Sequence, residues 1–87
     1  MMARSPSGES LLTRVVRTFE AFGPEEPVLT VSEIGRRAAL PQATTARLVK
    51  EMTGHGLLAW DDDRKVRIGT RMWELAERAS PVRRTRW

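Results

Sequence analysis

Two closely spaced helix starts constrain the fold of this chain more than any other feature. Thr30 and Glu33, in the stretch TVSE, have the spacing of a capping box, in which each side chain accepts a hydrogen bond from the backbone of the first helical turn. Pro41 suits the first turn of another helix, because its missing N–H would be unpaired there in any case. We therefore expect one helix to run to about Ala39 and the next to follow almost at once, which is helix-turn-helix spacing.

Apolar residues support a helix on each side of this turn. Leu29 and Ile34 stand where a hydrophobic staple would join them, and Val31, Ile34 and Ala38 form a short apolar stripe. The preceding segment, residues 10–22, has helical periodicity, with Ser10 as its expected N-cap. Its apolar residues are Leu11, Leu12, Val15, Val16, Phe19 and Phe22, and the residues turned outward are Arg14, Arg17 and Glu20.

The helix expected over residues 41–54 has an unusual outer face. Its core face comprises Thr45, Leu48, Val49 and Met52. The opposite face comprises Ala43, Arg47, Lys50 and Gly54, flanked by Thr44 and Ala46. Surface helices usually carry long Glu and Lys side chains, whereas this face is short apart from two cations. A helix of this kind can be approached closely by a partner.

The remainder of the chain predicts a hairpin and a fourth helix. The stretches LLAW and KVRI read as two short strands around the turn DDDR, and Gly56 is expected to end the helix before them. In GTRMWELAERAS we expect Thr70 as N-cap and Trp73 in the core, with a dimer surface as the alternative place for Trp73. The apolar stripe of this helix comprises Met72, Leu75, Ala76 and Ala79.

These elements predict a mainly α fold with a small β-hairpin, namely a winged helix-turn-helix of three helices and a two-stranded wing, plus a C-terminal linker helix. We expect residues 1–9 to be a flexible arm, residues 10–69 the winged helix-turn-helix, residues 70–80 a linker and dimerisation helix, and residues 81–87 a loose basic tail. A chain of 87 residues makes one small domain with a modest core.

Composition narrows the function classes. Fifteen Lys and Arg residues against eleven acids give a net charge of +4, which favours nucleic acid as a partner, although a GC-rich genome also enriches arginine. The chain has no cysteine and a single histidine, His55, so neither a disulfide nor a metal site is expected. His55 is expected at a helix C-terminus. No apolar run has the length of a membrane helix. Glu74 and Glu77 lack a nucleophile or cofactor motif beside them, so we expect neither an enzyme nor a cofactor.

The order and spacing of three segments resemble the N-terminal DNA-binding domain of the IclR family of bacterial transcription regulators. These segments are LTVSEIGRRAALPQATTARLV, GLLAWDDDRKVRIG and TRMWELA. The resemblance covers about residues 11–79. It implies a cytoplasmic protein that associates with the nucleoid when bound. It also implies double-stranded DNA with a palindromic operator as the partner, and a homodimer formed through the first and fourth helices.

The chain departs from the family pattern in four ways. Ala39 stands where the family usually has glycine, so the turn is expected to be strained or differently shaped. Gly35 lies inside a helix, at a cost of about 1 kcal/mol relative to Ala. Asp61, Asp62 and Asp63 weaken the wing as a phosphate clamp. The family also carries a larger C-terminal domain that binds a small molecule. Here the chain stops after the linking helix, which fits either a fragment or a stand-alone protein.

The candidate DNA-binding residues form two groups. The helix group matches the family's recognition positions at Gln42, Ala43, Thr44 and Arg47, with Lys50 added from the residue pattern, and the wing group is Arg64, Lys65 and Arg67. The alternatives are ordinary capping for Gln42 and Thr44, and solvated surface charge for the cations. Arg36 and Arg37 are expected to be solvated. The alternative function is a winged helix that binds proteins without specific DNA binding.

Overall fold

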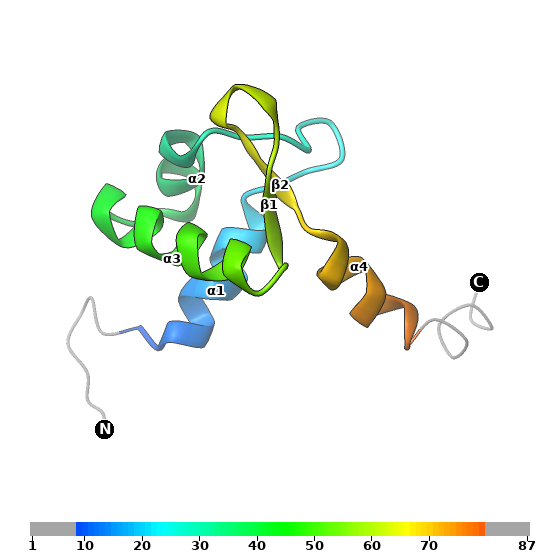
Figure 1. Cartoon of the computed structure of the whole chain (residues 1–87). Coiled ribbons are helices and arrows are strands. Elements are labelled where there is room, and N and C mark those ends of the chain that lie inside the picture. The colour runs from blue at the N-terminus through cyan, green and yellow to red at the C-terminus, as the bar shows by residue number, and fades with distance from the viewer. Residues whose placement is uncertain (1–8, 80–87) are drawn as a thin grey trace.

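The computed structural model describes residues 9–79, and the order of its elements is that of a winged helix-turn-helix (Figure 1). Three helices are followed by a two-stranded antiparallel hairpin and a fourth helix, which confirms the predicted fold class. The elements are α1 Leu11–Glu20, α2 Val31–Ala38, α3 Gln42–Gly54, β1 Leu58–Trp60, β2 Val66–Ile68 and α4 Thr70–Glu77. Apart from Glu9, the predicted arm lies outside the described residues, as does the predicted tail.

Helix α1 begins where the sequence predicts and ends slightly earlier. The side chain of Ser10 accepts a hydrogen bond from the backbone N–H of Thr13 at 3.1 Å, so the predicted N-cap is confirmed. The helix ends at Glu20 rather than at residue 22. The chain then turns into a tight loop, in which Gly23 and Glu26 exchange two backbone hydrogen bonds of 3.3 and 3.0 Å.

Helix α2 begins with the predicted capping box. The backbone N–H of Thr30 donates to Glu33 Oε1 at 2.8 Å, and the N–H of Glu33 donates to Thr30 Oγ1 at 3.1 Å. The hydrogen bond from the Thr30 backbone lowers the pKa of Glu33, because it favours the ionised carboxylate. Leu29 and Ile34, the two residues of the predicted staple, are both buried in the core.

The turn between α2 and α3 was expected to be either strained or differently shaped at Ala39, and the structure shows that it is strained. Ala39 has φ 57° and ψ 47°, in the left-handed region that glycine tolerates best. Its N–H bonds to Arg36 O at 3.3 Å, and the N–H of Leu40 bonds to Gly35 O at 2.9 Å, which is the Schellman pattern of a helix end. Pro41 is the N-cap of α3 and lies just before the helix, not in its first turn as expected.

Helices α2 and α3 lie close together at Gly35. An added Cβ would collide with the Gln42 side-chain amide and would stand 2.9 Å from Thr45 Oγ1. The glycine inside the helix is therefore explained by packing, because only a residue without a side chain lets the two helices come this near.

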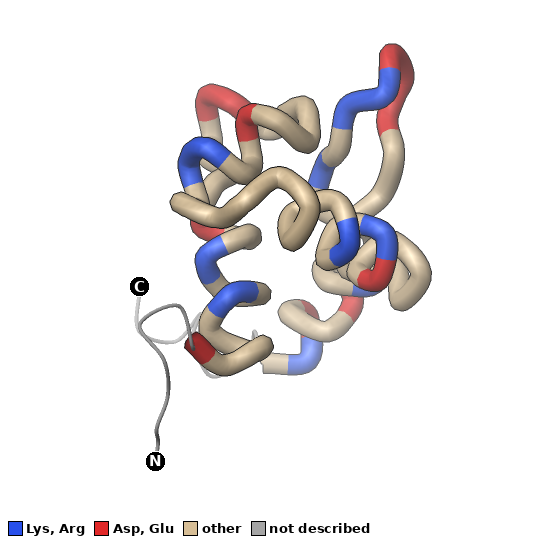
Figure 2. The backbone as a smooth tube through the Cα atoms, turned by 90° about the vertical axis from the view of Figure 1, so that its left-hand side faces the viewer, with Lys and Arg blue, Asp and Glu red and all other residues tan. Residues whose placement is uncertain are grey.

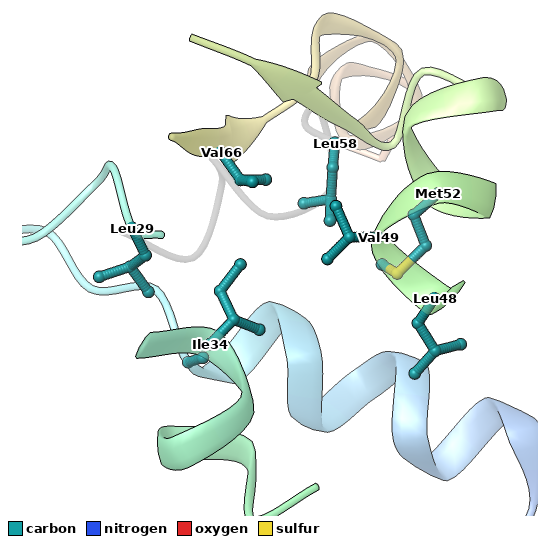
Figure 3. Packing of buried hydrophobic residues seen from close by; sticks show 8 residues of the cluster. Leu29, Ile34, Leu48, Val49, Met52, Leu58 and Val66 are labelled. Atoms are coloured by element: carbon teal, nitrogen blue, oxygen red, sulfur yellow. The ribbon is translucent and has the colours of Figure 1, made fainter. Parts of the chain in front are cut away.

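The core lies between the helices and the hairpin (Figure 3). Leu29, which precedes α2, pairs with Val66 of β2 through two backbone hydrogen bonds of 2.9 and 2.7 Å. This bridge adds a third short segment to the edge of the hairpin, and the sequence analysis missed it. The buried apolar residues of the cluster are Ala21, Leu29, Ile34, Leu48, Val49, Met52, Leu58 and Val66.

The hairpin pairs Leu58 with Ile68 and Trp60 with Val66. Its connection is a tight turn over residues 62–64, closed by a hydrogen bond of 3.3 Å from the N–H of Lys65 to the carbonyl oxygen of Asp62. Within it, Asp63 and Arg64 have φ of 62° and 61°.

Helix α4 corrects two expectations. Its N-cap is Gly69 rather than Thr70, and the carbonyl oxygen of Gly56 accepts the N–H of Arg71 in the first turn at 3.2 Å. Trp73 is 66% exposed, so its expected place in the core is wrong. No described residue of α4 is fully buried, and the predicted apolar stripe lies at the surface or is half-buried.

Candidate nucleic-acid interface

Helix α3 has the two faces that the sequence predicts. The side chains of Thr45, Leu48, Val49 and Met52 are buried, and those of Ala43, Arg47 and Lys50 are exposed, as is Gly54. The helix ends in a Schellman pattern, in which the N–H of Gly56 bonds to Thr53 O at 3.1 Å and Gly56 has φ 78°. His55 is the C-cap residue, as expected.

Two side-chain hydrogen bonds fix the N-terminal end of α3. The buried hydroxyl of Thr45 donates to the carbonyl oxygen of Pro41 at 2.9 Å, within the first turn. The side-chain amide of Gln42 donates to the carbonyl oxygen of Ser32 at 3.3 Å, so it links α3 to the start of α2. Gln42 is otherwise exposed, and its amide oxygen has no hydrogen-bond partner among the described residues.

The exposed face of α3 combines short side chains with two available cations. Ala43 and Ala46 are exposed and project only a methyl group from the helix. Arg47 and Lys50 are exposed, and neither forms an ion pair within residues 9–79. The backbone of α3 can therefore approach a flat or grooved partner, and both charges are available to it.

The N-terminus of α3 leaves backbone donors open. Pro41 supplies no side-chain hydrogen bond to the helix, and the first intrahelical N–H to be bonded is that of Thr45, which donates to Pro41 O at 2.9 Å. The N–H groups of Gln42, Ala43 and Thr44 have no acceptor in the described part of the chain. Together with the helix dipole they make this end attractive to an anion.

The three candidate cations of the wing do not lie together in the structure. Arg64 and Lys65 are exposed at the tip of the hairpin, beside the three aspartates, and Figure 2 shows the acidic and basic stretches meeting there. Arg67 lies further along β2, in an apolar depression between β2 and the end of α1, and also faces α4. The wing tip therefore presents two of the predicted cations, and the third points to a different part of the surface.

Two arginines have roles that the sequence analysis missed. The guanidinium of Arg17 donates to the carbonyl oxygens of Ala38 and Ala39, at 2.6 and 3.2 Å, and so satisfies the end of α2. Arg37, which was expected to be solvated, forms an ion pair with Glu26 at 2.6 Å and donates to Ala21 O at 3.4 Å. The side-chain hydrogen bond from Arg37 lowers the pKa of Glu26. No local sequence signal predicts these contacts, because the partners are far apart in the chain.

Residues 11–62 match the sequence profile of the IclR helix-turn-helix domain. This chain belongs to the IclR family. The match covers α1, α2, α3, β1 and the start of the wing turn.

Solved IclR structures agree with this assignment. An IclR homolog from Microbacterium sp. strain HM58-2 is 50% identical with a TM-score of 0.86, over 90% of this chain and 33% of that chain. An IclR homolog from Microbacterium hydrocarbonoxydans, complexed with 4-hydroxybenzoate, is 52% identical with a TM-score of 0.74, over 76% and 28%. An IclR family transcriptional regulator from Brucella abortus is 26% identical with a TM-score of 0.69, over 74% and 25%. Among curated proteins, no significant match was found.

The IclR assignment identifies the chain as a DNA-binding module of a transcription regulator. The chain spans a third or less of the length of these solved regulators. Among residues 9–79, no helix is long and apolar enough to cross a membrane, and no group of His, Cys, Asp or Glu has the arrangement of a metal site.

Proposed function

We propose that this chain binds double-stranded DNA in a sequence-specific manner, with α3 in the major groove. The observation that carries the proposal is the exposed face of α3, where small residues lie beside two cations that form no ion pair with the described residues. A helix face that contacts only solvent usually carries long polar side chains, whereas positions 43 and 46 of this face are alanine.

The dimensions of DNA account for this face. The major groove is about 12 Å wide and admits one helix, whose N-terminal turns meet the base edges. Ala43 and Ala46 let the backbone of α3 come close to the bases, and Arg47 then reaches a base edge, where its planar guanidinium matches the two acceptors of guanine. Gln42 offers its amide oxygen as an acceptor, while one N–H of its amide donates to the carbonyl oxygen of Ser32.

Other cations position the helix rather than read the sequence. Lys50 and the wing-tip residues Arg64 and Lys65 contact phosphates, and these contacts carry no sequence information. The aspartates beside the wing tip reduce this contribution, so α3 supplies most of the affinity.

Two copies bind a palindromic operator as a dimer. The exposed apolar residues of α1, Leu11, Leu12 and Val16, and Trp73 of α4 form surfaces that a second copy covers. A two-fold dimer places two α3 helices on half-sites that are one helical turn apart, and this doubles the number of phosphate contacts. The site of action is the bacterial chromosome in the cytoplasm.

The test uses duplexes selected by the protein from a random pool, compared with shuffled duplexes of the same composition, over a series of salt concentrations. The logarithm of the binding constant for both should fall linearly with the logarithm of salt concentration, because released counterions drive binding. The selected duplex should bind at least about tenfold more tightly at each concentration.

The other outcomes have distinct meanings. Equal affinity for both duplexes would contradict sequence-specific recognition and leave only charge-driven binding. If neither duplex bound at low salt, the chain would instead be a winged helix that binds proteins, and the DNA proposal would be wrong.

A further inference from the structure

A polar pocket lies between α1 and the start of α3, next to the proposed groove face. Its volume is about 400 Å³, which is ample for a phosphate group. We call it the α1–α3 pocket. The residues that line it are Glu9, Arg14, Arg17, Ala39, Leu40, Pro41 and Thr44.

Arg17 is held in place by one end of its guanidinium group. Nη2 donates to the carbonyl oxygens of Ala38 and Ala39, at 2.6 and 3.2 Å. Nη1, the other terminal nitrogen, forms an ion pair with the carboxylate of Glu9. The backbone contacts of Nη2 therefore fix the direction in which Nη1 presents its positive charge, before any ligand binds.

The N-terminal end of helix α3 borders the same pocket. Pro41 and Thr44, at its N-terminus, both line the pocket, and the N–H groups of the first turn have no acceptor among the described residues. A second guanidinium group, that of Arg14, also lines it. The pocket thus combines the fixed guanidinium group of Arg17 and the positive charge of Arg14 with the positive end of a helix.

The carboxylate of Glu9 shows that this place accepts an anion. An ionised carboxylate and a backbone phosphodiester both carry about one negative charge on oxygen acceptors. The side chains of Glu9 and Arg17 are 38% and 27% exposed, so the ion pair lies at the mouth of the pocket and can open to water. Glu9 also precedes α1 in the chain, so it can leave without disturbing a helix.

From this geometry we infer that the α1–α3 pocket binds a phosphate of the DNA backbone, and that Glu9 is a built-in competitor for Arg17. When DNA binds, the phosphate takes the place of the Glu9 carboxylate on Nη1 of Arg17, and Glu9 turns into solvent. The inference rests on the proposed DNA binding. It adds a phosphate contact from α1 and an intramolecular competitor that lowers the affinity for DNA.

The competition between Glu9 and the phosphate for Arg17 has a functional consequence. Breaking the exposed pair between Glu9 and Arg17 is a small cost that applies to every DNA sequence equally. It therefore lowers affinity for all duplexes and leaves the preference for an operator unchanged, because preference comes from base contacts on α3.

The test compares two variants that each remove one negative charge, either just before α1 or at its last residue. Glu9→Gln removes the competitor and keeps the side-chain shape. Glu20→Gln is the matched control, because Glu20 is exposed and has no ion pair with a described residue. We expect Glu9→Gln to tighten binding to selected and shuffled duplexes alike by about two- to fivefold. We expect Glu20→Gln to tighten it by less than about twofold, through long-range charge alone.

A second arm locates the phosphate. Duplexes with one neutral methylphosphonate are scanned along the backbone, and at one phosphate per half-site the advantage of Glu9→Gln should disappear. Equal effects of the two glutamine variants, or an advantage that survives at every position, would overturn the inference. Either result could occur while wild-type protein still binds its selected duplex, so a failure here differs from a failure of the proposed function.

Discussion

The guanidinium of Arg17 in α1 donates a hydrogen bond to the carbonyl oxygen of Ala38, the last residue of α2, at 2.6 Å. In return, Arg37 of α2 donates to the carbonyl oxygen of Ala21, the C-cap residue of α1, at 3.4 Å. Each helix thus satisfies carbonyl groups at the end of the other. The exchange fixes the strained turn at Ala39, from which α3 departs, and so it helps to set the position of the proposed reading helix.

We expect Ala39→Gly to raise the free energy of unfolding by about 0.5–1 kcal/mol. A left-handed conformation costs an L-residue about 1–2 kcal/mol, and the greater freedom of glycine in the unfolded chain offsets part of that gain. Ala38→Gly is the control, because Ala38 is helical and buried, and this change should lower stability. Urea unfolding followed by circular dichroism measures both. A loss of stability in Ala39→Gly would show that the turn is not strained.

Gly35→Ala should destabilise the fold by about 1–3 kcal/mol, although alanine is the better helix former. The new methyl group would press on the Gln42 amide, which can swing aside, and on the buried hydroxyl of Thr45, which cannot. Gly54→Ala is the opposite case, since nothing lies within 4 Å of a Cβ at that position, and it should be stabilising. Thermal unfolding of the two variants should shift in opposite directions. Shifts of the same sign would contradict close packing of α2 on α3.

Arg47→Ala should weaken binding to the selected duplex by about 1–3 kcal/mol and relax the preference at one base position. Arg47 is exposed on the face of α3 opposite the buried residues Leu48 and Val49. Arg78→Ala removes the same charge from the end of α4 and should change affinity much less. Affinity and a repeated selection from random duplexes give both readouts. Unchanged affinity in a folded Arg47→Ala protein would remove Arg47 from the reading helix.

Replacing the wing cations Arg64, Lys65 and Arg67 by alanine should weaken binding to all duplexes alike and flatten the salt dependence by about 0.9 per lost phosphate contact. Because Arg67 lies away from the tip, the double variant Arg64→Ala with Lys65→Ala should account for most of the effect. Salt titrations of the double, triple and Arg67→Ala proteins separate the contributions. A loss confined to one sequence would mean that the wing reads bases.

Trp73→Ala should reduce cooperative binding to a palindromic site more than it reduces binding to a half-site. Trp73 is 66% exposed on α4, and a second copy would remove this apolar surface from water. Trp60→Ala, which removes an exposed indole from the wing, should leave cooperativity unchanged. Ultracentrifugation with half-site and full-site duplexes counts the bound chains. One chain per full site at saturation would contradict the dimer.

The sequence by itself determined the elements whose causes are local. The capping box of Thr30 and Glu33, the N-cap Ser10 and the two faces of α3 depend on residues within a few turns of one another, so their spacing could be read directly. The exposure of Ala43, Arg47 and Lys50 on α3 followed from the same periodicity, whereas the choice of Gln42 and Thr44 as candidates came from the family resemblance. Their role in binding stays a prediction.

The tertiary structure decided what depends on contacts between distant segments. The bridge between Leu29 and Val66 and the hold of Arg17 on the end of α2 join residues that no spacing rule relates. Thr70 is a good N-cap by type, yet α4 begins one residue earlier, with Gly69 as its N-cap and the Gly56 carbonyl oxygen bonded to the N–H of Arg71. Trp73 is a good core residue by type, yet no described element covers its side of α4. Local chemistry sets which residues can begin a helix or form its apolar face, and packing decides which of those possibilities the folded chain uses.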